Sequence, residues 1–136
     1  MSLLKAMLDT NTVSALIRSP QLRSVRERLV GFGTDRVCIS IISSAEISYG
    51  FAKRPSDKLR RNLDLLLETL PVVPFEAPAD AEYGALRGHL AAIGRPIGPN
   101  DLFIAAHALA LDLTLITANI GEFSRVPNLR VENWLD

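Results

Sequence analysis

Short apolar runs alternate along this chain with longer segments whose apolar residues recur at helical spacing. Leucines recur at intervals of three and four residues from Leu59 to Leu70, which predicts a helix over Ser56–Leu70 with one apolar face. Leu113–Thr117 is instead a short, mainly apolar run, which suits a strand buried in a parallel sheet. The alternation of the two patterns predicts an α/β sandwich, in which helices pack on a mostly parallel sheet.

The expected elements follow from these runs and from the prolines and glycines between them. The predicted strands are Leu3–Leu8, Val37–Ile41, Val72–Phe75, Leu113–Thr117 and a last strand within Leu129–Trp134. The predicted helices are Thr12–Ile17, its continuation from Pro20 to Leu29, Ser43–Lys53, Ser56–Leu70, Ala79–Ile93 and Asn100–Leu111. Gly31 and Gly33 are expected beyond the end of the helix that reaches Leu29. No linker or repeat interrupts this order, which predicts one domain over residues 1–136.

Composition places the chain among globular proteins. It has 136 residues, of which 48% are hydrophobic and 22% charged, enough for a sizeable core. No apolar run is long enough to span a membrane. Lys5 and Asp9 come too early for a signal peptide, and the single Cys38 cannot form a disulfide within the chain. We therefore expect a cytoplasmic protein with a buried free thiol.

The net charge is zero, but the charges are segregated along the chain. Arg18 to Arg61 contains ten basic and four acidic residues, a balance of +6. From Asn62 onward there are four arginines and ten acids, a balance of −6. One interpretation is a basic rim that meets a polyanion beside an acidic centre. The other is a set of solvated helix faces.

Three acids occur where a helix is predicted to begin: Asp9, Glu46 and Asp101. Each has a structural interpretation. Asp9 would cap a helix, Glu46 would complete a capping box with Ser43, and Asp101 would offset a helix dipole. Together they can face one cleft at the carboxyl end of the sheet. Converging carboxylates repel one another, and a divalent cation such as Mg²⁺ or Mn²⁺ relieves that repulsion.

The segments around these acids resemble the motifs of PIN-domain ribonucleases, in the same order. The segments that carry the resemblance are Met7–Asn11, Ile42–Gly50, Ile97–Ala106, and Leu115–Asn119 with Glu122–Phe123. The C-terminal segment Val126–Trp134 is typical of the VapC group, the toxin half of bacterial toxin–antitoxin pairs. The resemblance covers nearly the whole chain and implies a PIN-like three-layer α/β/α sandwich.

The resemblance also implies an activity, that of an endoribonuclease dependent on Mg²⁺ or Mn²⁺. It assigns catalysis and metal binding to Asp9, Glu46 and Asp101. Oxygen-ligated metal ions suit phosphodiester hydrolysis, because they activate water and stabilise a dianionic transition state. No histidine is needed, and His107 is expected at the edge of the core rather than as a ligand.

Further residues are expected to support this site. By the same resemblance, Thr10 and Asn11 orient the first acid or reach a phosphate, and Thr117 forms a hydrogen bond within the site. The structural alternatives are helix capping for Thr10 and Asn11, and the end of a strand for Thr117. Asn119 stands where many PIN domains carry a fourth acid; its amide can bind a metal ion through its oxygen but adds no negative charge. Glu122 can replace that acid if its loop folds back; otherwise it is a solvent-facing residue.

Partners follow from the resemblance and from the charges. We expect an RNA substrate on a rim that includes Arg18, Arg23 and Arg26. We also expect a homodimer and a small cognate antitoxin, whose helix would dock on Ser56–Leu70.

Two other classes of protein are considered. A phosphoacceptor receiver domain needs a lysine near its last strand, and no lysine follows Lys58. A PIN-fold module that binds RNA or protein with little or no catalysis remains the alternative to the nuclease.

Overall fold

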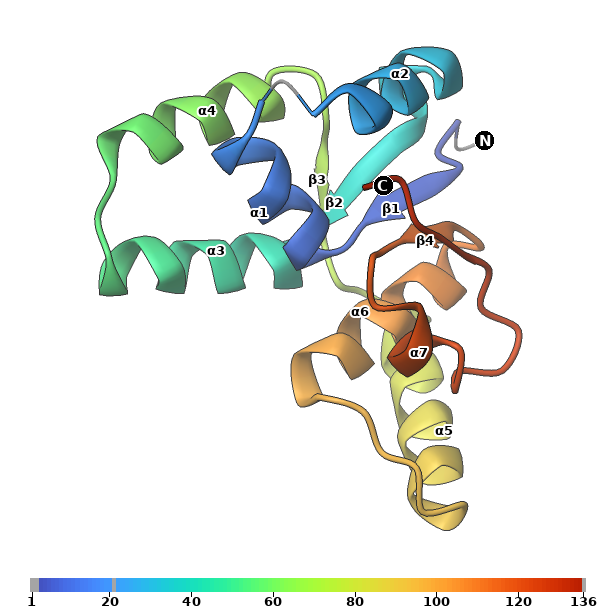
Figure 1. Ribbon diagram of the computed structural model, residues 1–136. Helices are drawn as coiled ribbons and strands as arrows, with labels where there is room; N and C mark the ends of the chain where they lie inside the picture. Colours follow the sequence, from blue (N-terminus) through green and yellow to red (C-terminus); the bar gives the residue numbers. More distant parts are fainter. Residues whose placement is uncertain (1–2, 21, 136) are drawn as a thin grey trace.

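The computed structural model describes residues 3–20 and 22–135. Its elements along the chain (Figure 1) are β1 (Ala6–Leu8), α1 (Thr10–Arg18), α2 (Arg23–Phe32), the 3-10 helix η1 (Thr34–Arg36), β2 (Val37–Ser40), α3 (Ile41–Lys53), α4 (Asp57–Leu67), β3 (Val72–Val73), α5 (Ala79–Ala92), α6 (Pro99–Ala110), β4 (Thr114–Ile116), α7 (Ile120–Phe123) and β5 (Val131–Glu132). The α/β class predicted from the alternating pattern is confirmed.

The strands form one parallel sheet in the order β3-β2-β1-β4-β5. Leu8 at the end of β1 is in register with Ile39 on one side and Ile116 on the other. The carboxyl ends of the three central strands therefore meet at one edge of the sheet, where ligands bind in open α/β folds.

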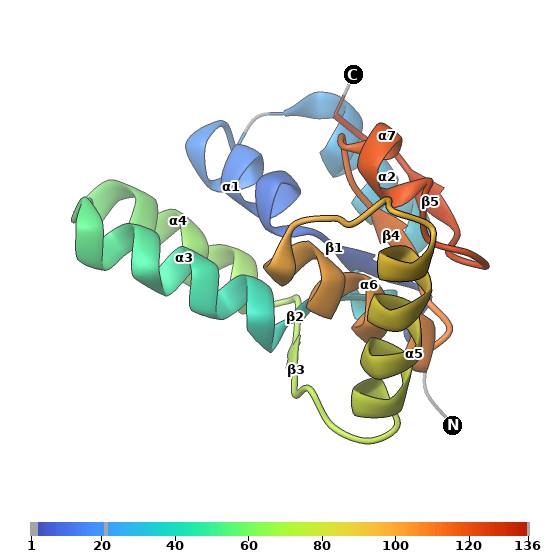
Figure 2. The same ribbon diagram turned by 90° about the horizontal axis from the view of Figure 1, so that it is seen from below.

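Helices cover both faces of the sheet (Figures 1 and 2). Leu8 and Ile39 pack into a core with α1, α2, α3 and α4. Met7 and Cys38, one position away in each strand, pack into a second core with α5, α6 and α7. This alternation follows from the two-residue period of a strand and gives the expected three layers.

Most predicted elements are present, with shorter strands than predicted. The last strand is confirmed as Val131–Glu132, in the predicted segment. The prediction for Gly31 is wrong, because α2 continues through it to Phe32. Gly33 ends the helix with φ of 99°, a backbone conformation that favours glycine. The short elements η1 and α7 were not predicted, since single helical turns have no periodic pattern.

Cys38 is buried and is a free thiol, as predicted. Burial raises the pKa of its thiol to about 12, which keeps it protonated and unreactive. Within residues 3–20 and 22–135, no helix is both long and apolar enough to cross a bilayer.

The start of α3 differs from the predicted capping box at Ser43. Ser40, the last residue of β2, accepts a hydrogen bond from the backbone N–H of Ile42 at 3.0 Å and caps the helix. Strand and helix therefore join without a loop, so the helix begins two residues earlier than predicted. The Ser40 hydroxyl also lies 2.8 Å from Nδ1 of His107 on α6. His107 was expected at the edge of the core, but it is fully buried, and burial lowers its pKa.

We predict that Ser40→Ala lowers the free energy of unfolding by about 2–3 kcal/mol. It removes a helix cap, worth about 1 kcal/mol, and leaves a buried ring nitrogen without its partner, at about 1–3 kcal/mol. Ser56→Ala is the matched control, because Ser56 caps α4 through Leu59 N–H but has no buried second partner. Chemical denaturation of the two variants measures the difference; equal losses would contradict the role of His107.

Candidate functional site

Three predicted site residues follow the central strands at their common edge. Asp9 comes directly after β1, Glu46 lies on α3 after β2, and Thr117 comes directly after β4. Asp101 lies in the first turn of α6. The topology therefore brings together segments that are up to 108 residues apart in sequence, from Asp9 to Thr117.

Asp9 is buried, with 3% of its surface exposed. Its Oδ1 accepts a hydrogen bond from the backbone N–H of Thr12 at 2.8 Å and caps α1. The capping interpretation is therefore correct, but it occupies only one carboxylate oxygen. The other lone pairs of the carboxylate stay available to a ligand.

Glu46 lies in the second turn of α3, not at its start as predicted. Its Oε1 accepts a hydrogen bond from Thr10 Oγ1 at 2.5 Å, and its Oε2 accepts one from Asn100 Nδ2 at 3.1 Å. Ser43 Oγ lies 3.0 Å from the same Thr10 hydroxyl. Because a carboxylate can only accept, Thr10 gives its proton to Glu46. Thr10 thus orients the second acid rather than the first.

The pKa of Asp101 shows that the acids of the site lie close together. Its pKa is raised to about 7 by burial first, then by the charge and a hydrogen bond of Glu122, and then by the charges of Glu46 and Asp9. Four carboxylates therefore act on one another in this site. At neutral pH the cluster retains part of a proton in the absence of other positive charge.

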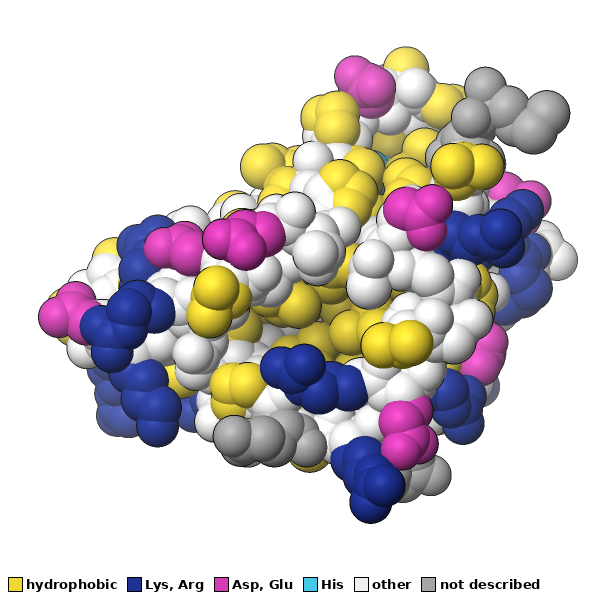
Figure 3. All heavy atoms as spheres, turned by 90° about the horizontal axis from the view of Figure 1, so that it is seen from above, with side chains coloured by type: hydrophobic (Ala, Val, Ile, Leu, Met, Phe, Trp, Pro, Cys, Tyr) yellow, Lys and Arg dark blue, Asp and Glu magenta, His cyan; other side chains and the backbone are white. Residues whose placement is uncertain are grey.

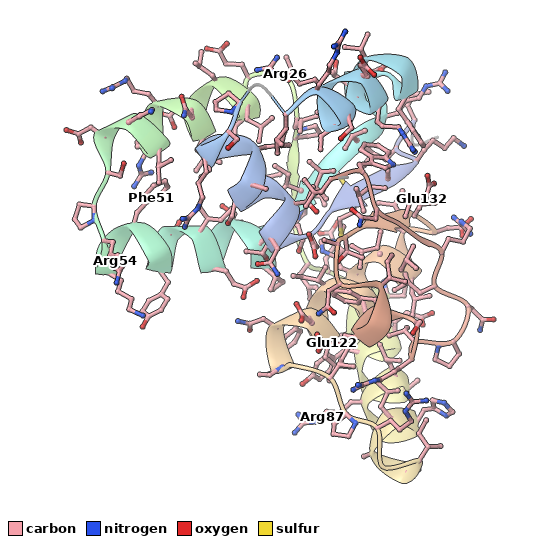
Figure 4. The ribbon with its side chains drawn as sticks, in the orientation of Figure 1. Arg26, Phe51, Arg54, Arg87, Glu122 and Glu132 are labelled. Carbon is pink, nitrogen blue, oxygen red and sulfur yellow. The ribbon has the colours of Figure 1, made fainter. Side chains whose placement is uncertain are left out.

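Glu122 (labelled in Figure 4) is the fourth carboxylate of the cluster. Its Oε1 accepts a hydrogen bond from Gly98 N–H at 2.7 Å, and its Oε2 accepts one from Asn119 Nδ2 at 2.5 Å. Asn119 N–H in turn donates to Thr117 Oγ1 at 2.9 Å. The loop after β4 therefore folds back toward α6, and the amide of Asn119 holds Glu122.

Gly98 lies against two of these acids. A Cβ at this position would lie 3.5 Å from Asp101 Oδ2 and 3.6 Å from Glu122 Oε1. The backbone N–H of Gly98 therefore faces a site already lined by carboxylate oxygens. Asn100 and Gly98 were missed as site residues, although both stand in the Ile97–Ala106 motif.

The donor set fits a hard divalent cation. Its ligands would all be oxygens, as Mg²⁺ and Mn²⁺ prefer, and the cluster carries excess negative charge. In the part of the chain that the structure describes, no three Asp, Glu, His or Cys side chains are arranged closely enough to enclose an ion by themselves. Such an ion would complete its shell with water or phosphate oxygens, as Mg²⁺ commonly does.

The remaining predicted residues lie at different distances from this cluster. Asn11 is exposed and forms no side-chain hydrogen bond with a described residue. Arg18 lines a groove that also contains Thr10 and Glu46. Arg23 and Arg26 lie on α2, away from that groove.

Both arginines of α2 already have partners. Arg23 pairs with Glu27 in an exposed ion pair at 3.1 Å. Arg26 donates from Nε to the carbonyl of Pro20 and lines a separate, apolar groove. Of the three arginines expected on the RNA rim, only Arg18 therefore lines the groove that contains Glu46.

Known proteins resemble this chain in sequence and structure. A profile of the PIN domain matches residues 6–129. Ribonuclease VapC2 of Rickettsia felis is 41% identical over 130 residues, which are 94% of this chain and 96% of the relative. The tRNA(fMet)-specific endonuclease VapC of Salmonella typhimurium is 38% identical over 135 residues, which are 97% and 99% of the two chains. The crystal structure of VapBC2 from Rickettsia felis bound to promoter DNA has a chain that matches with a TM-score of 0.88 and 37% identity, over 96% of this chain and 99% of that one.

These similarities extend over nearly the full length of the two chains in each comparison. They agree with the order of the motifs and with the parallel sheet that gathers their acids at one edge. The chain therefore belongs to the PIN-domain family, in its VapC group of ribonucleases.

Proposed function

We propose that this PIN-domain ribonuclease is an endonuclease that uses Mg²⁺ or Mn²⁺ to hydrolyse RNA, and that it is the toxin of a toxin–antitoxin pair. The observation that carries the proposal is the mutual effect of four carboxylates, Asp9, Glu46, Asp101 and Glu122, which raises the pKa of Asp101 to about 7. A bound ion would supply a water that is nucleophilic near neutral pH and positive charge opposite the phosphate.

The neighbours of the acids keep them in place for this role. The helix cap at Thr12 fixes one oxygen of Asp9, and the hydrogen bonds from Thr10 and Asn100 fix both oxygens of Glu46. Asp101 is held on the first turn of α6 beside Glu122. Such preorganisation lowers the cost of assembling charges at the moment of reaction.

The first RNA to test is initiator tRNA. The Salmonella typhimurium relative, 38% identical over nearly the whole chain, is named a tRNA(fMet)-specific endonuclease. The four carboxylates perform the chemistry in any RNA, so the choice of substrate depends on the surfaces around them.

The antitoxin is proposed to dock in the apolar groove between α1, α2 and α4 (Figure 3). The groove encloses about 220 Å³ and includes the predicted docking helix. Leu65 on α4 and Val30 on α2 line it and are 62% and 78% exposed. The matched structures from Rickettsia felis and Salmonella typhimurium are VapBC complexes, which supports an antitoxin as the occupant. An amphipathic helix buries its apolar face in grooves of this kind.

A homodimer remains part of the proposal. Large apolar side chains are exposed outside the groove, among them Ile93 and Leu3. Light scattering at high micromolar concentration tests the dimer, and a strict monomer would contradict it.

The second candidate function is an RNA- or protein-binding module with little catalysis. It is favoured by Asn119, which stands where a fourth acid is common. Metal-dependent cleavage of initiator tRNA by the purified chain separates the two functions, because a binding module would bind without cutting.

We predict that Asp101→Asn abolishes cleavage and stabilises the metal-free protein. The raised pKa of Asp101 means that the folded parent loses stability as the pH rises from about 4 through about 7. The variant should therefore unfold with a free energy at least about 1 kcal/mol higher than the parent at pH 8 in a chelator.

At pH 4 most of that difference should be lost, because Asp101 is then protonated in the folded parent and about half protonated in the unfolded one. Added Mg²⁺ should stabilise the parent more than the variant. Thermal melts with and without chelator at both pH values measure this, alongside cleavage. Cleavage at the parental rate would show that Asp101 is not in the metal site.

We predict that Glu122→Gln raises the Mg²⁺ concentration for half-maximal cleavage by about tenfold or more. It removes a charge from the cluster and sets an amide against the Asn119 amide that now donates to Glu122. Asn119→Asp should change the Mg²⁺ concentration for half-maximal cleavage less, since its new charge would face Glu122. Mg²⁺ titrations of cleavage decide between the two; a larger shift with Asn119→Asp would make position 119 the fourth ligand.

We predict that Leu65→Glu weakens antitoxin binding about tenfold or more without altering cleavage, because it places a charge in the apolar groove. Leu111→Glu is the control, since Leu111 is also exposed but lies at the end of α6. Calorimetry with the cognate antitoxin measures both. Equal effects of the two substitutions would place the antitoxin elsewhere.

A further inference from the structure

A second groove leads away from the carboxylates between α1 and α3, toward the turn that joins α3 to α4. It encloses about 350 Å³. Thr10 and Glu46 line it at the site, and Arg18, Lys53 and Arg54 line it beyond α1 and α3. Figure 4 labels Phe51 and Arg54 at the C-terminal end of α3, where the groove ends. The groove is therefore acidic where it meets the site and basic where it leaves it.

One face of α3 runs along this path. Glu46, Gly50 and Lys53 lie at helical spacing and all line the groove. The rise of 1.5 Å per residue places Lys53 about 10 Å from Glu46 along the helix axis. A short stretch of nucleic acid strand can span that distance, so one strand can contact both residues.

The cations of the groove have no acidic partners among residues 3–20 and 22–135. Arg18, Lys53 and Arg54 are exposed, and none forms an ion pair with a described residue. Other arginines of the basic segment differ: Arg23 pairs with Glu27, and Arg28 pairs with Glu132. The positive charge of the groove is thus free to meet an anionic ligand.

An aromatic ring lies beside Lys53, next to the groove but outside its lining residues. Tyr49 on α3 is 68% exposed, and Lys53 Nζ lies 6.0 Å from the centre of its ring. Exposed aromatic rings next to phosphate-binding cations are typical of single-strand binding surfaces, because bases stack on the rings.

Gly50 keeps the middle of the groove open. A Cβ at this position would have no atom within 4 Å, so the space beyond the backbone is free. Glycine weakens a helix relative to alanine, and neither a close contact nor a positive φ requires it here. A long side chain at this position would extend into the groove.

We propose that this groove binds the single-stranded RNA on one side of the scissile phosphate. Arg18, Lys53 and Arg54 contact its phosphates, and Tyr49 stacks one base. The inference rests on the proposed ribonuclease function and adds a path for the substrate. An antitoxin is the weaker candidate for this groove, because the apolar groove on the other side of α1 suits a helix better.

The test compares two triple variants of equal charge. The groove variant combines Arg18→Gln, Lys53→Gln and Arg54→Gln. The control combines Arg23→Gln, Lys58→Gln and Arg61→Gln, which belong to the same basic segment but do not line the groove. Cleavage of initiator tRNA gives kcat and KM. Binding of a short single-stranded oligoribonucleotide, in an Asp101→Asn background, gives the salt dependence of affinity.

The groove variant should raise KM about tenfold with little change in kcat, and should lower the salt slope by about 2, because each phosphate contact to a single strand contributes about 0.7. The control should change neither. Equal slopes and KM values for the two triples would overturn the inference, as would a groove variant that loses only antitoxin affinity.

Single substitutions test the open space at Gly50 and the aromatic ring of Tyr49. Gly50→Met should raise KM more than Gly50→Ala, since only methionine reaches far into the groove. Tyr49→Leu should weaken binding of the oligoribonucleotide and leave the salt slope unchanged, because it removes stacking but no charge. An effect of Gly50→Ala as large as that of Gly50→Met would show that the helix, not the space, matters.

The outcome for the groove is separable from that for the proposed function. If the parent cuts no RNA, the nuclease proposal fails, while the salt slopes of binding still decide the groove. If the parent cuts RNA and the two triples behave alike, the groove inference alone fails.

Discussion

Mutual repulsion among carboxylates is the constraint around which the site of this protein is built. Asp9, Glu46, Asp101 and Glu122 come from four segments of the chain, and the pKa of Asp101 is raised to about 7 by their company and by burial. Charges of one sign move apart unless the backbone prevents it. The parallel sheet does so, because it aligns the ends of β1, β2 and β4 at one edge and starts α1 and α3 there.

Hydrogen bonds from neutral groups complete the restraint. Thr10 and Asn100 hold Glu46, and Asn119 and the backbone of Gly98 hold Glu122. None of these donors carries a charge, so they orient the acids without neutralising them. The negative potential of the site is thereby kept for a cation. On the far side of Glu46 the charge changes sign, and the exposed cations of the second groove begin.

Much of this could be predicted from the sequence, for identifiable reasons. The motif acids Asp9, Glu46 and Asp101 could be placed together because their segments follow predicted strands or open a predicted helix in a parallel fold. Glu122 could not be decided, since the path of the loop after β4 depends on a hydrogen bond to Gly98, 24 residues away in the chain.

The first residue of a helix, and the side of the molecule on which a charged side chain lies, were harder to predict. The predicted cap of α3 was Ser43, but the cap in the structure is Ser40, whose hydroxyl also lies at hydrogen-bond distance from His107. Arg23 and Arg26 were grouped with Arg18 because all three lie in one basic segment. The turn at Ser19 and Pro20 separates them, since it directs α2 to a different side of the molecule from the groove beside α1.

Helix α1 is a wall shared by both grooves, and Ile17 lines each of them. The helix has only nine residues, about 14 Å of length. The sequence on one face of this short helix therefore cannot change without affecting the groove on the other face. A replacement at Ile17 that adapts the groove proposed for the antitoxin would also reshape the groove proposed for RNA, so partner choice and substrate choice would change together.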